Sequence, residues 1–166
     1  MSGIFEKLGS YQILTNLLPG AFFSLALKIF FGLALPTKSF GEDIVVYYFV
    51  GLIVNRIGSL VIEPFLKKIR FISFAPYPDF VKATKDDSKI DTLSEMNNYT
   101  RALLTSVLVL PVVGVLQALS LKWPCFSVCL KWGAIISLAV LFLFAYKKQT
   151  KYVRNRVEAV MSQTEK

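Results

Sequence analysis

The sequence predicts an all-α integral membrane protein with about four transmembrane helices. The mean hydropathy of the 166-residue chain is +0.54, and 54% of its residues are hydrophobic. Both values are high for a soluble domain. The apolar residues also form long blocks between short charged stretches, which is the pattern that a bilayer imposes. We therefore expect one membrane domain that spans residues 1–166.

Four apolar blocks are long enough to cross a bilayer, and charged or aromatic residues mark their ends. The spans are expected at residues 13–35, 44–66, 102–121 and 128–146. The first contains Pro19-Gly20, which membrane helices tolerate. The cluster Lys67-Lys68 stops the second span, and Trp123 and Trp132 fit an aromatic belt at the start of the fourth.

The positions of Lys and Arg predict the orientation. One group of segments carries most of the basic residues, namely Lys7, Lys67, Lys68, Arg70, Lys82, Lys85, Lys89, Arg101, Lys147, Lys148, Lys151, Arg154, Arg156 and Lys166. The alternate segments carry only Lys38, Lys122 and Lys131. Because basic residues stay on the cytoplasmic side, both termini and the central loop are expected on the cytoplasmic face of the membrane.

The polar segments 67–101 and 147–166 are expected to form a small cytoplasmic layer. Pro78 can begin a short helix over 79–84, and Asp86-Asp87-Ser88 is a capping cluster for the next helix. That next helix has no breaker before the third span, and the fourth span likewise continues into the basic tail. We expect both spans to extend into the cytoplasm as helices.

Composition argues against an enzyme. The chain has no His, which removes the commonest general base and metal ligand. Cys125 and Cys129 match no zinc or disulfide framework, and there is no Gly-rich phosphate loop. We expect no catalytic residue, no metal site and no cofactor. The net charge of +8 is explained by membrane orientation, so direct nucleic-acid binding is not expected.

The second span carries the polar residues that most suggest a function. Arg56 lies near its centre, where an unpaired charge costs roughly 2.5–3.5 kcal/mol or more. Helical spacing places Arg56, Ser59 and Glu63 on one face. A small-polar stripe runs beside them: Gly51, Asn55 and Gly58. Such stripes allow close helix packing, so we expect an intramembrane polar site and a subunit interface here.

Three roles remain open for these charges. Arg56 and Glu63 could pair with neighbours and fix the fold, with Lys67 and Arg101 as basic candidates for Glu63. Arg56 and Asn55 could instead line a water-filled vestibule or a bistable element. Contact with lipid headgroups is the third role.

The basic residues of the cytoplasmic layer form a candidate docking surface. They are Lys82, Lys85, Lys147, Lys148, Lys151, Arg154 and Arg156. For the charged residues of the central loop (Lys82, Lys85, Asp86, Asp87 and Lys89) a solvated face is the commoner explanation. The layer is nevertheless large enough to bind a cytosolic protein and too small to be a catalytic domain.

Three stretches resemble a known group of proteins: residues 51–64 (GLIVNRIGSLVIEP), 79–83 (DFVKA) and 97–101 (NNYTR). They look like small multi-span membrane proteins of bacterial phage-defence loci, such as Kiwa-type membrane subunits and the membrane ancillaries of CRISPR systems. The resemblance implies a homo-oligomer that senses infection or perturbs the membrane, often with a soluble partner.

Together these observations predict a non-enzymatic, oligomeric inner-membrane sensor or effector in antiviral defence. Its expected partners are membrane lipids, further copies of the chain and a cytosolic protein. Two alternatives stay open: a pore-forming or holin-like protein, and a small transporter that uses Glu63 or Arg56 as its intramembrane charge.

Overall fold

The described part of the chain is helical, as the sequence predicts. The structure is a computed structural model, and it describes the backbone of residues 2–35 and 39–164. Its helices are α1 (Ser2–Phe31), α2 (Phe40–Ile57), η1 (Gly58–Ile62), α3 (Glu63–Lys68), α4 (Tyr77–Asp86), α5 (Lys89–Lys122) and α6 (Pro124–Thr164). Because α2, η1 and α3 follow one another without a gap, these elements make five continuous helices in the described ranges.

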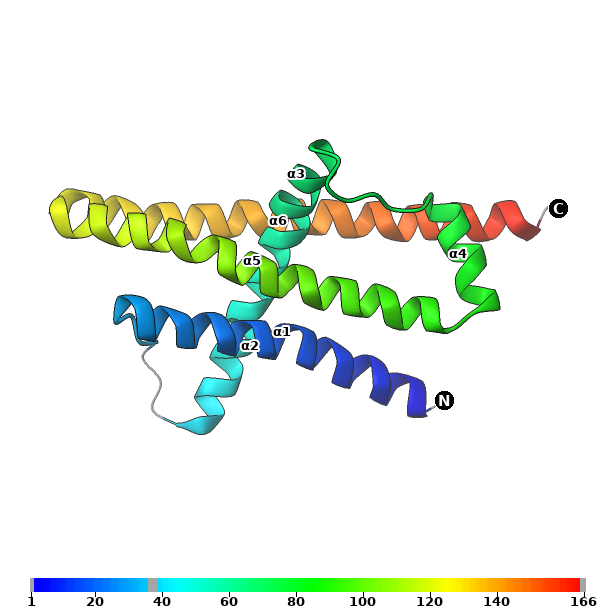
Figure 1. Ribbon diagram of the computed structural model, residues 1–166, viewed down its shortest axis with the longest axis horizontal. Helices are drawn as coiled ribbons and strands as arrows, with labels where there is room; N and C mark the ends of the chain where they lie inside the picture. The colour runs from blue at the N-terminus through cyan, green and yellow to red at the C-terminus, as the bar shows by residue number, and fades with distance from the viewer. Residues whose placement is uncertain (1, 36–38, 165–166) are drawn as a thin grey trace.

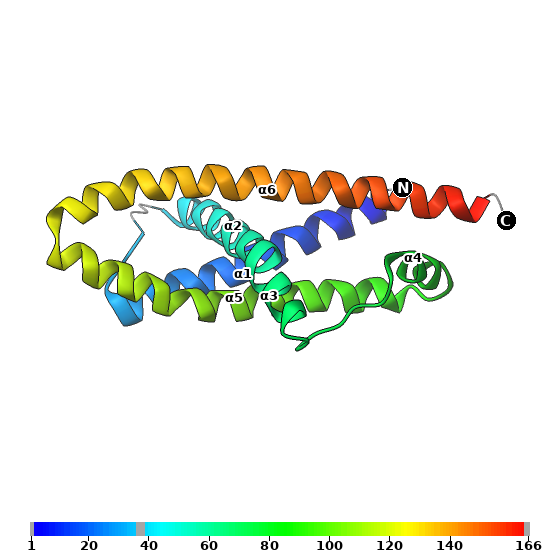
Figure 2. The same cartoon turned by 90° about the horizontal axis from the view of Figure 1, so that it is seen from above.

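Two of the helices form a long antiparallel hairpin, and the others pack against it. Helices α5 and α6 are joined by a tight turn at Trp123 and run back along one another (Figure 1). Helix α1 lies beside α5. The continuous helix α2–η1–α3 runs across α1, α5 and α6 in Figure 1, and the second view shows it crossing α1 and α5 (Figure 2).

Three helices are long and apolar enough to cross a membrane: Phe40–Lys68, Lys89–Lys122 and Val128–Met161. A fourth apolar stretch, Thr15–Phe31, is shorter. Only 22%, 17% and 6% of the most apolar windows of the three long helices are buried inside the chain. A soluble monomer rarely exposes so much contiguous apolar surface, so these faces fit a lipid environment.

The first apolar helix ends earlier than the sequence pattern suggests. The expected span runs to Leu35, but α1 stops at Phe31 because Gly32 adopts a left-handed backbone with φ +66°. Glycine accepts this conformation without a steric penalty and commonly ends helices. The side-chain amide of Gln117 on α5 then donates to the free carbonyl of Phe31 at 3.1 Å.

Both predicted helical extensions are present. Helix α5 begins at Lys89 and runs unbroken through the expected third span, and α6 continues through the basic tail to Thr164. The predicted short helix is α4. The capping cluster acts through Asp87, whose carboxylate accepts the backbone N–H of Lys89 at 2.9 Å, whereas Ser88 makes no side-chain cap.

The crossing of α1 and α2 depends on two glycines. A Cβ on Gly20 would lie 1.8 Å from the carbonyl oxygen of Tyr47, and a Cβ on Gly51 would lie 1.7 Å from that of Asn16. No side chain fits at either position, so the two backbones touch directly. This contact fixes where α2 crosses α1 and therefore where the polar residues of α2 face the rest of the chain.

Candidate functional site

The site is built around a π-helical turn in the second apolar helix. The turn is η1, and the backbone N–H of Glu63 donates to the carbonyl of Gly58, five residues back. The next residue is Pro64, which has no N–H to donate and whose ring crowds the carbonyl four residues before it. A local π turn relieves that crowding. It also leaves the carbonyl of Ser59 without its usual helical donor.

Lys148 of α6 supplies the missing donor. Its Nζ donates to the Ser59 carbonyl at 2.6 Å and to the Ser59 hydroxyl at 2.7 Å. The lysine side chain is 23% exposed and Ser59 is buried. A buried carbonyl without a donor costs about 1–3 kcal/mol, so Lys148 both stabilises η1 and ties α6 to it.

Glu63 is the centre of a charge cluster that joins three helices. It is buried, and its carboxylate lies 3.0 Å from Nζ of Lys67 and 3.7 Å from Nζ of Lys148. Arg101 of α5 forms the third ion pair. The predicted pairing of Glu63 with Lys67 and Arg101 is confirmed. The contribution of Lys148 could not be foreseen, because it depends on the path of α6.

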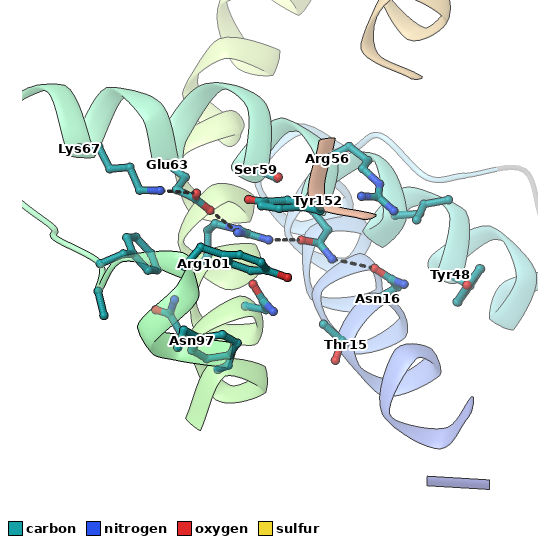
Figure 3. Close-up of a pocket in the computed structure, with 18 residues that line it drawn as sticks. Thr15, Asn16, Tyr48, Arg56, Ser59, Glu63, Lys67, Asn97, Arg101 and Tyr152 are labelled. Atoms are coloured by element: carbon teal, nitrogen blue, oxygen red, sulfur yellow. Dashed lines mark hydrogen bonds and ion pairs between the residues drawn. The ribbon is translucent and has the colours of Figure 1, made fainter. Parts of the chain in front are cut away.

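A chain of amides continues the cluster to α1. The guanidinium of Arg101 donates to Oδ1 of Asn55 at 3.0 Å, and the Asn55 amide donates to Oδ1 of Asn16 at 3.1 Å. Figure 3 shows this connected path from Lys67 through Glu63 and Arg101 to Asn16, and the amide between Arg101 and Asn16 is that of Asn55. The path links α1, α2, α3 and α5, and Lys148 adds α6. Asn16 was not singled out from the sequence, although an amide inside an apolar block is a signal for a cross-helix hydrogen bond.

A cavity of about 610 Å³ lies beside this path, and we call it the junction cavity. Its charged lining residues are Arg56, Glu63, Lys67 and Arg101. Its aromatic lining residues are Tyr48, Phe74, Tyr77, Phe80 and Tyr152, and its amides are Asn16, Asn55, Asn97 and Asn98. These residues come from the apolar helices and from the polar segments, so the cavity lies where the two meet (Figure 3).

Arg56 lines the junction cavity and stands apart from the charge cluster. Among the side chains that the structure describes, none forms an ion pair or a hydrogen bond with Arg56. The expected face is correct, because Leu52, Ser59 and Glu63 line the same cavity. No ion pair joins Arg56 to Glu63 in the described part of the chain, and Glu63 is already surrounded by cations from three helices. The guanidinium is accommodated by a polar cavity instead.

The small-residue stripe is used within the chain. Gly51 contacts α1, and a Cβ on Gly58 would lie 2.4 Å from the hydroxyl of Thr105 on α5. Both glycines are therefore occupied by intramolecular helix packing. A contact between copies of the chain would have to use other surfaces.

The basic residues proposed for docking fall into separate groups. Lys82, Lys147, Lys151 and Arg156 are exposed, whereas Arg154 is paired with Glu158 at 2.7 Å. Lys85 has a partner of its own. Lys148 points inward and belongs to the junction. The tail thus combines an outward basic face with one inward lysine.

No group of three or more His, Cys, Asp or Glu that could hold a metal occurs within residues 2–35 and 39–164. Cys129 is a free, exposed thiol. The side chain of Cys125, like the predicted outer-loop Lys38 and the terminal Lys166, lies outside the described residues.

Comparison of the chain with protein-family models, with curated proteins and with solved structures finds no match.

Proposed function

We propose that this chain is a non-enzymatic sensor or effector of the bacterial inner membrane, in which the cytoplasmic tail controls the packing of the spans. The observation that carries the proposal is the position of Lys148. It lies on the helix that continues into the basic tail, and its ammonium group holds the π turn of the second apolar helix. A force or a partner acting on the tail would act directly on this contact.

The membrane topology that suits this role has four spans with both termini in the cytoplasm. The shorter apolar helix Thr15–Phe31 would be the first span. Helix α2–η1–α3 crosses the α5–α6 hairpin (Figure 1), and in this topology the crossing helices tilt to opposite sides of the bilayer normal. Membrane helices tilt by up to about 40° from the normal. The distribution of Lys and Arg supports the orientation.

The resemblance to phage-defence membrane proteins supplies the biological setting of the proposal. In that setting the chain would assemble into a homo-oligomer and work with a cytosolic partner. The outward basic residues of the tail are the proposed docking surface: Lys147, Lys151 and Arg156. The apolar faces of α5 and α6, which are largely uncovered within one chain, leave room for contacts between copies and with lipid.

A pair of lysine variants tests the coupling. Lys148→Met removes the donor to Ser59, and Lys89→Met removes an exposed charge outside both the junction and the proposed docking surface, as the control. We expect Lys148→Met to abolish protection against phage in plaque counts while the protein still inserts, and Lys89→Met to retain protection. Protection by a stable, inserted Lys148→Met protein would refute the coupling role.

A transporter or pore is the second candidate, because Arg56 and Glu63 of one predicted span both line the junction cavity. Reconstituted protein in liposomes separates these functions. Release of a trapped dye would favour the pore, and substrate-driven proton flux would favour the transporter. Tight liposomes together with phage protection would favour the sensor.

A further inference from the structure

We propose that the junction cavity binds a phosphate-bearing anion, either a lipid headgroup or a soluble phosphate compound. This inference names the ligand class that the proposed sensor would recognise, and to that extent it rests on the proposed function. Three features of the cavity favour such a ligand: its charge, the unpartnered guanidinium of Arg56 in its lining, and its size.

The lining of the junction cavity carries a net positive charge. Arg56, Lys67 and Arg101 line the cavity, and Glu63 is the one carboxylate among its described lining residues. That carboxylate is shared by Lys67, Arg101 and the nearby Lys148. The cluster is therefore cationic even when every ion pair is counted. Cations gathered in a partly closed site attract an anion more strongly than they would in open water.

Two arginines that line the cavity have N–H donors without a hydrogen-bond partner in the described part of the chain. The guanidinium of Arg56 has no partner among the described side chains and lines the cavity. The Nε atom of Arg101 is buried and also has no hydrogen-bond partner in the described part of the chain. An unpaired buried donor is rare in folded proteins, and each such group calls for an explanation. A guanidinium matches phosphate best, because its parallel N–H groups bind two oxygens at once.

The volume and the polar lining of the junction cavity suit a phosphate group. The cavity volume of about 610 Å³ falls within the range of sites for small molecules. Asn97 and Asn98 of α5 add amide groups to the lining, and Tyr48 and Tyr152 add hydroxyls on aromatic rings. These neutral donors can hydrogen-bond phosphate oxygens without changing the charge balance. The combination favours a phosphate over a simple carboxylate, which needs fewer donors.

Purified protein in nanodiscs tests the proposal directly. In the first arm, titration calorimetry in phosphatidylcholine nanodiscs measures the binding of inorganic phosphate and pyrophosphate. In the second arm, native mass spectrometry counts the phosphatidylglycerol retained from nanodiscs of mixed phosphatidylglycerol and phosphatidylcholine. The binding variant is Arg56→Gln, and the matched control is Arg156→Gln, which removes the same charge from the exposed tail.

We expect wild type and Arg156→Gln to bind in at least one arm and Arg56→Gln to lose about tenfold in affinity or retention, the usual effect of removing one charge-assisted hydrogen bond. Binding in the first arm identifies a soluble phosphate compound, and retention in the second arm identifies a lipid headgroup. Equal binding by Arg56→Gln and Arg156→Gln, or no binding by wild type in either arm, overturns the proposal.

A second variant covers the case in which Arg56→Gln fails to fold. Asn97 is exposed and lines the cavity, so Asn97→Trp should narrow the cavity without disturbing the buried path. We expect it to reduce the same binding, and unchanged binding would count against the cavity as the site. Because binding is measured on purified protein, loss of the ligand inference stays separate from loss of phage protection in Lys148→Met.

Discussion

Removing the carboxylate of Glu63 should cost more stability than removing any single cation around it. In wild type the buried carboxylate of Glu63 forms ion pairs with Lys67, Arg101 and Lys148 together. Glu63→Gln keeps the shape of the side chain but leaves three cations without an anion. Breaking a buried ion pair from one side costs about 3–5 kcal/mol. We expect the free energy of unfolding to fall by about that amount.

The matched variant Arg101→Met should have a smaller effect. Glu63 then still has Lys67 at 3.0 Å and Lys148 at 3.7 Å, while Asn55 loses the donor that Arg101 provides. We expect a loss of about 1–3 kcal/mol, the cost of one unsatisfied buried group. The difference between the two variants follows from the sharing of one carboxylate by several cations.

A double-mutant cycle in detergent micelles tests this reasoning. Unfolding by sodium dodecyl sulfate, followed by circular dichroism, gives the free energies. Glu63→Gln and Arg101→Met should couple by more than about 1 kcal/mol, as residues in direct contact do. Glu63→Gln and Arg56→Leu should add within about 0.5 kcal/mol, because these residues do not pair. Strong coupling of Glu63 to Arg56, or equal losses from Glu63→Gln and Arg101→Met, would refute the assigned network.

Three further predictions use the same structure. Alkaline phosphatase fused after Lys166 should be inactive and after Lys122 active, and an active tail fusion would contradict the proposed topology. Gly51→Leu should lower the thermal midpoint and prevent correct assembly because its Cβ has no space, whereas Gly133→Ala, with nothing within 4 Å of the new Cβ, should be neutral or stabilising. Pro64→Ala restores a backbone N–H, so η1 should relax toward an α-helix and infrared or hydrogen-exchange measurements should show added protection there; unchanged exchange would argue against proline as the cause of the π turn.

Hydropathy and charge were sufficient to predict the long apolar helices, because both can be read from consecutive residues of the sequence. The three long apolar helices and the extensions of α5 and α6 agree with the sequence pattern. The end of α1 was missed because Gly32 lies inside an apolar run, where hydropathy gives no sign that the backbone turns. The left-handed backbone at Gly32 ends the helix although the surrounding residues are apolar.

The candidate site was predictable only in part, and the reason is the geometry between helices. Arg56 and Glu63 were correctly placed on one face, but the π turn lies between them and changes the helical phase after Gly58. Helical spacing therefore says little about which of them meets a third helix. The pairing of Glu63 with Arg101 could be foreseen, because Glu63 and Arg101 lie near the same end of two predicted spans.

Lys148 shows most clearly why a sequence cannot distinguish a docking residue from a structural one. It stands beside Lys147 in a basic tail, and composition treats the two alike. In the structure Lys147 is exposed, whereas Lys148 reaches the carbonyl that the π turn leaves free. One residue of helical phase, about 100°, separates these environments. In the proposed coupling, rotation or sliding of the tail breaks the contact between Lys148 and Ser59, whereas the exposed Lys147 takes no part in the junction. A signal from the cytoplasm would therefore reach the spans through the lysine that does not face the partner.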